Sequence, residues 1–439
     1  MVKNVKIKIR NFGPIKSGLD ANDGFIEISK VTLFCGPQGS GKSTVAKVLS
    51  SMMWLEKAAY YVGWDLENAV FDDAGAFMRD VLSFHGLTTY FTESTEISYR
   101  GNYLSIDFEH GRTLVQCVDR LNVNYVKPKI MYMPAERNFL HYLEFAVASR
   151  LLPPPLVALL GEYKAARAEI QDTYSIPING YRLVYDADKD DYFIENVHSD
   201  GKPARTPIPE SSSGLQSLLP MSLVTNYLSA HIGHDARKSP DINSLSLSNN
   251  PFLASTQEKN CVYNGSSLPL DGVRFVRRST ESSNCFVNIV EEPEQNLFPP
   301  TQRRVLRHLL EVNNARQNNR LIISTHSPYI VSDLVAATKA NKLFRMRDGY
   351  KGPNEEAFEL LEKCYPERYS VSNNDVRLYE TNYDGSIKLD ACTNGIINDS
   401  NFLNRHLRLG NMLFDELCGL EDVLAAGDRV EKSSNAGSL

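Results

Sequence analysis

Apolar and basic residues alternate at the start of the chain, where Val5, Ile7 and Ile9 are separated by lysines. A period of two predicts a strand with one buried face. A continuous apolar run at 31–35 then predicts a short strand that is buried on both faces, as in a parallel sheet. A glycine-rich turn follows, and residues 43–57 have the pattern of a helix. Strand, glycine-rich turn and helix in this order predict an α/β sheet with a phosphate loop.

The pattern also predicts further elements of such a sheet, separated by glycine- and proline-rich breaks. Hairpins are predicted at 96–108 and 181–196, strands at 24–28, 129–133, 286–290 and 321–324, and helices over most of 58–88, over 139–172 with a break at 153–155, at 212–230 and at 301–312. We therefore expect one large α/β sheet with several insertions.

These elements divide the chain into three parts. Residues 1–335 are predicted to form the head, with a helical and hairpin insertion at about 51–128 and a poorly ordered, Ser- and Asn-rich insertion at about 231–284. Residues 340–425 predict a small mixed α/β C-terminal subdomain for contacts with other proteins, which includes an apolar helix at 402–420. Residues 429–439 predict a disordered tail.

Composition narrows the classes of function. With a net charge of −6, the chain has no general basic field to attract nucleic acid, so any DNA contact needs a local patch. No run of 18 apolar residues is present, so we expect no membrane span and no membrane partner. Seven scattered cysteines without a CxxC pair favour a reducing compartment. We therefore expect a cytoplasmic protein.

The strongest chemical motif is a phosphate-binding loop of the form GxxxxGK[ST], directly after the strand at 31–35. In such loops glycines let backbone N–H groups surround a phosphate, the lysine reaches the β- and γ-oxygens, and the final hydroxyl binds Mg²⁺. Lys42 and Ser43 have these last two roles. The expected ligands are ATP and Mg²⁺. The predicted nucleotide-binding residues are Gly36, Pro37, Gln38, Gly39, Ser40, Gly41, Lys42, Ser43 and Thr44.

Two later strands end in residues suited to hydrolysis. The strand at 286–290 leads into Glu291, predicted to lie near the Mg²⁺, and Glu292, predicted to polarise the attacking water. A glutamate stands at 291 in place of the usual aspartate. The strand at 321–324 leads into His326, predicted to sense the γ-phosphate. The alternatives are an acidic strand end facing solvent and an ordinary polar histidine, and the order of the motifs disfavours both.

A serine-glycine turn opens the predicted helix at 212–230. Because N–H groups at a helix N-terminus bind anions, Ser212, Ser213 and Gly214 predict a phosphate contact. An ordinary helix cap is the alternative. The turn lies between the phosphate loop and the carboxylates along the chain, and the family resemblance given below implies a contact with the γ-phosphate held by a second copy.

Five segments together resemble the RecF/SMC-like ATPases, which are ABC-type P-loop proteins. They are GPQGSGKST (36–44), MPAER (133–137), ESSSGLQSLLP (210–220), IVEEPEQNLFP (289–299) and IISTHSPYIV (322–331). The resemblance is greatest to the compact ATPases of anti-phage systems and OLD nucleases, including the ATPase subunits of Septu, retron-associated and PARIS systems. It implies an ABC-type ATPase head paired head to tail, as a homodimer or higher homo-oligomer, through its ATP sites. The implied catalytic residues are Lys42, Glu292 and His326, and the implied metal-binding residues are Ser43 and Glu291.

Other implications of the resemblance are less specific. Residues 293–297 would be the D-loop that joins the two sites. Glu136 and Arg137 stay open between nucleotide sensing and a structural ion pair. After residue 330 no DxD pair is present, so the TOPRIM pattern of OLD nucleases is missing. We therefore expect a separate effector, a nuclease or toxin, with DNA or a phage-encoded molecule as the candidate trigger.

Three other functions stay open at this point. A RecF/SMC-like repair or chromosome ATPase would act directly on DNA without a toxic partner. The ATP-binding subunit of a transporter would need a membrane-coupling surface. A nucleotide sensor would bind ATP without hydrolysing it.

Overall fold

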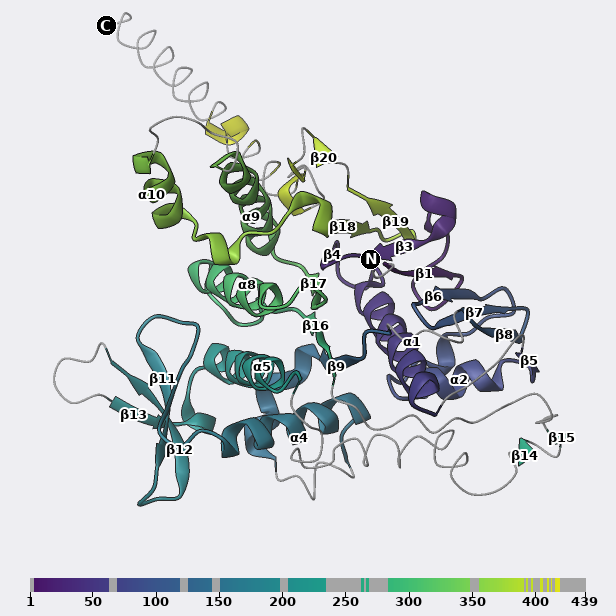
Figure 1. The fold of residues 1–439 in the computed structure, drawn as a ribbon, viewed down its shortest axis with the longest axis horizontal. Helices are drawn as coiled ribbons and strands as arrows, with labels where there is room; N and C mark the ends of the chain where they lie inside the picture. The colour runs from purple at the N-terminus through teal and green to yellow at the C-terminus, as the bar shows by residue number, and fades with distance from the viewer. Residues whose placement is uncertain are drawn as a thin grey trace, which may run out of the picture.

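The computed structural model describes residues 4–62, 69–118, 125–143, 151–197, 204–233, 283–347 and 355–390, with short pieces elsewhere (Figure 1). The prediction of a disordered tail at 429–439 lies outside the described residues. So does most of the predicted insertion at 231–284. Among the described residues, no helix combines the length and the apolar character needed to cross a membrane.

A seven-stranded sheet forms the centre of the molecule, in the order β2-β19-β18-β4-β17-β16-β9. Its strands are β2 (Gly18–Leu19), β4 (Val31–Cys35), β9 (Pro128–Met133), β16 (Cys285–Glu291), β17 (Arg320–Thr325), β18 (Val376–Thr381) and β19 (Ser386–Leu389). The five strands from β18 to β9 are parallel. Every residue of β4 and β16 is buried, as expected for apolar strands covered on both faces.

The pairing brings three predicted site segments to one edge of this sheet. β17 lies between β4 and β16, with Thr325 opposite Cys35 and Ser324 opposite Glu291. Carboxyl ends of parallel strands share an edge, and in open α/β sheets ligands bind there. The loop after β4, the histidine after β17 and the carboxylates after β16 therefore lie next to one another.

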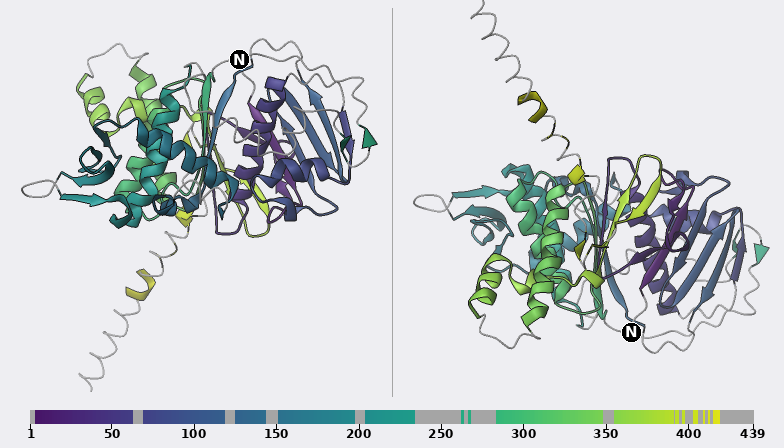
Figure 2. Two further views of the ribbon diagram at one scale, coloured as in Figure 1. Left: turned by 90° about the horizontal axis from the view of Figure 1, so that it is seen from below. Right: turned by 90° about the horizontal axis from the view of Figure 1, so that it is seen from above.

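Helices cover both faces of the central sheet (Figures 1 and 2). They are α1 (Lys42–Val62), α2 (Ala76–Ser83), α4 (Pro154–Ala168), α5 (Ser213–Ala230), α8 (Pro299–Asn314), α9 (Pro328–Arg347) and α10 (Glu355–Cys364). Successive side chains of β4 point to opposite faces of the sheet, so the hydrophobic core has two parts. Val31, Leu33 and Cys35 pack with α4, α5, α8 and α9, whereas Phe34 packs with α1.

A six-stranded antiparallel sheet packs on the α1 side of the molecule, in the order β3-β1-β6-β7-β8-β5 (Figure 2). Its strands are β1 (Val5–Arg10), β3 (Ile26–Ile28), β5 (Ala69–Asp72), β6 (Glu96–Arg100), β7 (Leu104–Glu109) and β8 (Arg112–Cys117). On the opposite side, a four-stranded sheet consists of β10 (Thr173–Ser175), β11 (Tyr181–Asp186), β12 (Asp191–Asn196) and β13 (Ala204–Pro207).

The predicted strands, hairpins and helices are present, with differences at two helices. The helix predicted over most of 58–88 ends at residue 62, and residues 69–72 form the edge strand β5. Gly75, with φ of +81°, separates this strand from α2. Within the segment predicted as helical at 139–172, residues 144–150 lie outside the described residues, the predicted break falls at Pro153, which caps α4, and α4 ends at Ala168. Before it, Ala135–Tyr142 forms a 3-10 helix, η3.

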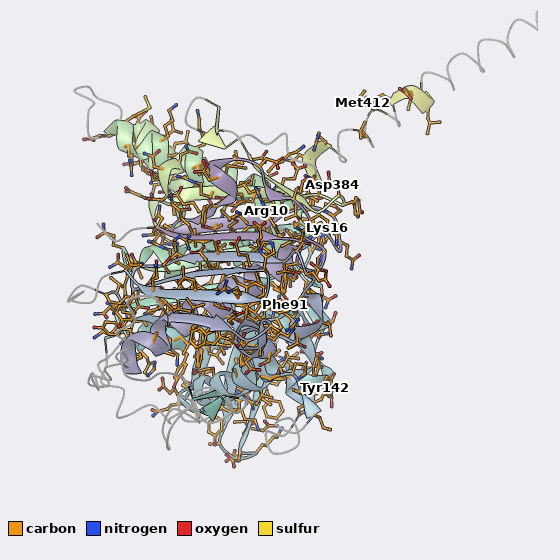
Figure 3. The ribbon with its side chains drawn as sticks, turned by 90° about the vertical axis from the view of Figure 1, so that its right-hand side faces the viewer. Arg10, Lys16, Phe91, Tyr142, Asp384 and Met412 are labelled. Atoms are coloured by element: carbon orange, nitrogen blue, oxygen red, sulfur yellow. The ribbon has the colours of Figure 1, made fainter. Side chains whose placement is uncertain are left out.

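The described part of the small C-terminal subdomain predicted at 340–425 adds two strands to the central sheet. β18 pairs with β4 and β19 pairs with β18, so this part of the chain completes the central sheet. Tyr379 of β18 stacks on Phe34 at 5.5 Å between ring centroids and bonds to the backbone of Glu27. A local pattern does not reveal which strand another strand will pair with, so the sequence did not indicate this. The described parts of the predicted helix at 402–420 are helical, and Met412 lies away from the body (Figure 3).

Candidate functional site

The loop between β4 and α1 has a backbone that only glycine allows. Gly36 has a φ of +141° and Gly41 a φ of +99°, values that L side chains rarely adopt. A Cβ at Gly36 would lie 2.2 Å from the carbonyl oxygen of Thr381, and one at Gly41 would lie 2.9 Å from the Ile15 side chain. The loop and the N-terminus of α1 therefore have the form of a phosphate cradle.

The ammonium group of Lys42 folds back onto this loop. Its Nζ donates to the carbonyl oxygen of Gly36 at 3.1 Å and to that of Pro37 at 2.7 Å. Burial lowers the pKa of Lys42 to about 8, and the negative charge of Glu292 opposes this shift. Ser43, the next residue, is exposed at the start of α1. A ligand in the loop could therefore reach the Ser43 hydroxyl.

Glu291, the last residue of β16, has the features expected of a metal-binding carboxylate. The residue is 4% exposed, and its Oε1 has no hydrogen-bond partner among the described residues. A buried carboxylate oxygen without a partner is costly, so a cation or a cation-bound water suits it. The neighbouring strand β9 places Tyr132 beside it, and burial together with the Glu291 charge raises the pKa of Tyr132.

Glu292 has a strained backbone. Its φ is +44°, which is unusual for a residue other than glycine. Its N–H donates to the carbonyl oxygen of Ser324 on β17 at 2.8 Å. Its carboxylate Oε1 lies 3.5 Å from Nε2 of His326. The predicted base and the predicted phosphate sensor are therefore neighbours.

The environment of His326 favours the neutral form of its imidazole. Burial and the positive charge of Lys42 lower the pKa of the imidazole to about 4, opposed by a hydrogen bond to the backbone of Gly36. Glu294 holds the segment that carries it, since Oε1 of Glu294 accepts from the Thr325 hydroxyl and from the His326 N–H, both at 2.7 Å. The loop after β16 and the loop after β17 are therefore joined.

Arg137 forms contacts that neither of its two predicted roles describes. It is fully buried, and it forms no ion pair with Glu136, whose side chain is exposed, or with any other described residue. Its guanidinium donates to four backbone carbonyl oxygens: those of Pro134 (3.1 Å), Ser217 (3.1 Å), Glu291 (2.6 Å) and Glu292 (2.7 Å). Among the described residues, the guanidinium therefore binds backbone carbonyls and not the Glu136 carboxylate.

The serine-glycine turn is held firmly while its serines face solvent. Ser212 and Ser213 are exposed, and the Ser212 hydroxyl caps α5 by accepting from the Leu215 N–H at 3.5 Å. A Cβ at Gly214 would lie 2.6 Å from the carbonyl oxygen of Asn296, so this glycine allows close packing against residues 293–297. Beside the turn, Tyr142 is exposed and donates to the carbonyl oxygen of Pro209 (Figure 3).

The structure brings together most, but not all, of the predicted site residues. The loop at 36–44, both carboxylates and His326 meet at one sheet edge. Within the described part of the chain, no hydrogen bond or ion pair joins 211–214 to the loop at 36–44. The serine-glycine turn at 211–214, called the signature turn below, is therefore not bonded to the phosphate loop of its own chain.

Thr381 is a contact of the site that the sequence did not indicate. Its Oγ1 lies 2.5 Å from the Ser40 hydroxyl and donates to the Cys35 carbonyl oxygen at 3.3 Å. It lies 341 residues from Ser40 and belongs to no motif. The strand pairing of β18 with β4 is what brings it to the loop.

The fold is an α/β fold with a phosphate loop at the carboxyl ends of its parallel strands. The histidine strand β17 separates the P-loop strand β4 from the carboxylate strand β16, and an antiparallel sheet lies beside α1. No family model matches the sequence, and no curated protein matches it.

Several solved structures are similar at low scores, and two of them are SMC heads. One is an SMC head domain from Thermotoga maritima, with a TM-score of 0.33 and 12% identity, covering 76% of this chain and 91% of that one. The other is an SmcHead bound to the C-winged helix domain of ScpA, with a TM-score of 0.30 and 10% identity, covering 90% of this chain and 98% of that one.

Proposed function

We propose that this chain is an ABC-type ATPase that binds Mg·ATP at the sheet edge and completes each active site with the signature turn of a second copy. One observation carries the proposal. The cradle, the carboxylates and the histidine converge within one chain, whereas Ser212 and Ser213 are exposed and, among the described residues, no hydrogen bond or ion pair joins them to the loop at 36–44. A head-to-tail pair would bring such a turn to the γ-phosphate of its partner, with two equal sites.

Each residue at the sheet edge has its own role in the proposed reaction. The loop N–H groups and Lys42 bind the β- and γ-phosphates. The Ser43 hydroxyl and the unpaired Oε1 of Glu291 would hold Mg²⁺, which would neutralise charge on the phosphate oxygens. Glu292 orients water for attack on the γ-phosphorus and accepts its proton while the bond to the leaving ADP oxygen breaks. Neutral His326 donates a hydrogen bond to the transferred phosphate.

We also propose that closure of the pair controls a separate effector, a nuclease or toxin, in an anti-phage defence complex. The motif resemblance favours this role, and a contact path supports it. Arg405 forms an ion pair with Glu380 of β18 at 2.9 Å, and the next residue, Thr381, contacts the Ser40 hydroxyl. A protein bound near Arg405 would therefore be connected to the phosphate loop. DNA or a phage-encoded molecule is the proposed trigger.

Substitution of Glu292 by Gln tests the ATPase. Loss of a general base lowers kcat by about 10²–10⁴-fold, and the variant should accumulate as an ATP-bound pair in size-exclusion chromatography with light scattering. Glu311→Gln, the same chemical change at a half-exposed surface ion pair, is the control and should keep the wild-type rate. Equal rates for Glu292→Gln and wild type would contradict the proposal and favour a non-hydrolysing sensor.

A tagged pull-down of wild type and Glu292→Gln from native host cells, with mass spectrometry, tests the effector. We expect a stoichiometric nuclease or toxin that the two forms retain to different extents. A homodimer that carries only DNA, and releases it as salt rises, would instead favour a repair or chromosome ATPase.

A further inference from the structure

Arg137 has no role in the reaction as described above, yet it is the largest of the fully buried side chains in the described part of the chain. We propose that it is a positioning residue that sets the direction of the Glu292 carboxylate and couples it to the signature helix α5. The inference rests on the proposed ATPase function. The observations behind it are the contacts of the guanidinium with the backbone of Glu291 and Glu292 on one side and with α5 on the other.

On one side, Arg137 holds the backbone that carries the base. Its two terminal nitrogens donate to the carbonyl oxygens of Glu291 and Glu292 at 2.6 and 2.7 Å. Glu292 has a φ of +44° and precedes Pro293, although a residue before proline favours extended backbone. Such strain persists only where neighbouring groups over-determine it. Arg137 holds the C=O of Glu292, and the Ser324 carbonyl holds its N–H.

On the other side, Arg137 binds α5 next to a site where a proline interrupts the helix. Pro220 lies inside α5 and has no N–H, so the carbonyl oxygen of Gln216, four residues earlier, lacks its helical donor. His141 of η3 lies against this oxygen, with its Nε2 at 2.7 Å. The next carbonyl oxygen, that of Ser217, accepts from Nε of Arg137 at 3.1 Å. The segment η3 therefore binds two successive carbonyls of the signature helix.

The tautomer and charge of His141 agree with this role. Burial lowers the pKa of His141 to about 4, so the ring is neutral at pH 7. A carbonyl only accepts, so Nε2 carries the proton and donates to Gln216. Nδ1 is then left to accept from the Tyr163 hydroxyl at 3.2 Å. Both ring nitrogens are used within the head, and η3 is fixed to α5 and α4 together.

A displacement of α5, which begins at the signature turn, would therefore move the guanidinium and with it the peptide on either side of Glu292. Engagement of the turn by a second nucleotide would be transmitted to the base. The cost of this arrangement agrees with a functional role. Four neutral carbonyls surround the buried guanidinium, and burial lowers the pKa of Arg137 to about 10 although the charges of Glu294 and Glu292 oppose this shift, so the burial of this cation does not favour stability.

Arg137→Met tests the inference, with Arg307→Met as the matched control. Arg307 forms a bidentate ion pair with Asp333 at 2.9 and 3.1 Å, which joins α8 to α9 and touches no site residue. We expect Arg137→Met to keep the affinity for a fluorescent ATP analogue within about threefold while kcat falls about 100-fold, since small misplacements of reacting groups have effects of this size. Arg307→Met should lose thermal stability but keep the wild-type kcat.

Unchanged kcat in Arg137→Met would overturn the inference, as would a loss of ATP affinity that accounts for the whole effect. If Arg137→Met does not fold, Arg137→Lys decides by the same assay. Lysine keeps the charge but cannot serve four carbonyls, so kcat should fall at least about tenfold with KM unchanged. A wild type without ATPase activity would instead reject the proposed function itself.

Discussion

The edge of the central sheet and the turn that opens α5 differ in how far their polar groups find hydrogen-bond partners within the same chain. At the edge, Lys42 and the His326 segment have partners within the chain. At the turn, Ser212 and Ser213 are exposed, and the cap hydrogen bond measures 3.5 Å. The edge can therefore accept a nucleotide by itself, whereas the turn offers N–H and hydroxyl groups to a molecule outside the chain.

The turn is nevertheless pre-formed. The side-chain amide of Gln216 donates to the carbonyl oxygens of Pro209 and Ser211, both at 2.9 Å. Gly214 packs on residues 293–297, and the Ser217 hydroxyl donates to Oε1 of Gln295 at 3.2 Å. Ordering a loop on binding lowers affinity, so a turn that is already ordered favours pairing. The edge and the turn are therefore both ordered before pairing. The edge has hydrogen-bond partners within the chain, whereas the turn offers its polar groups to a molecule outside it.

Mixing variants tests whether the turn acts in trans. Ser213→Arg and Lys42→Ala should each abolish ATP hydrolysis, because one blocks the turn and the other removes the phosphate-binding ammonium. In a 1:1 mixture half the pairs are mixed, and each mixed pair has one intact site of two. Activity should therefore return to about a quarter of the wild-type rate. The measurement is steady-state phosphate release at a fixed total concentration.

A second mixture is the control for this prediction. Lys42→Ala and Glu292→Gln both damage the edge, so no mixed pair of these two contains an intact site, and no activity should return. Recovery in both mixtures, or in neither, would show that the edge and the turn do not serve opposite chains.

The same contrast separates what the sequence could predict from what it could not. The phosphate loop, Glu291, Glu292 and His326 were found because each follows a buried strand and is read from contiguous residues. Parallel strands then place them at one edge whatever the detail of the insertions. The trans role of the turn came from motif order alone and stays a prediction.

The features that the sequence did not predict are contacts between residues far apart in the chain. Thr381 is brought to the site by the pairing of β18 with β4, which local pattern does not specify. The contacts of Arg137 go to backbone carbonyls, whose identity depends on tertiary packing and not on the side chains in the motif. A proline at 220 inside an apolar helix was a usable signal, because it predicts an unpaired carbonyl four residues earlier.

The lowered pKa of Lys42 predicts how the edge responds to pH. Without nucleotide the ammonium has a pKa of about 8, and bound phosphate, being anionic, raises it. Below pH 8 the ammonium is charged in both states, so this group adds no pH dependence. Above pH 8 the free site loses its proton and binding must take one up. Affinity should then fall by up to about tenfold per pH unit.

The measurement is the dissociation constant of a non-hydrolysable ATP analogue between pH 7 and 9.5. Lys42→Arg is the control, since a guanidinium stays charged throughout this range. Its profile should be flat, even if its affinity is lower. Identical profiles for wild type and Lys42→Arg would assign the pH dependence to another group.

The smallest expected effect concerns the contact between the edge and the C-terminal strand. Thr381→Val keeps the side-chain shape but removes the hydroxyl that lies 2.5 Å from Ser40 and bonds to Cys35. Loss of these bonds should cost about 1–2 kcal/mol of unfolding free energy. Because the lost contacts hold the loop itself, ATP affinity should also fall several-fold while kcat at saturating ATP stays near wild type.

Thr338→Val distinguishes a loop effect from general destabilisation. Thr338 is 1% exposed in α9, and its hydroxyl donates to the Val335 carbonyl oxygen at 2.8 Å, away from the site. Denaturant unfolding and analogue binding are measured for both variants. If the two lose the same stability and neither loses affinity, the Thr381 contact is structural only. If Thr381→Val alone loses affinity, the sheet edge depends on a strand that follows the last sequence motif by about 50 residues, and the C-terminal region has a direct route to the nucleotide.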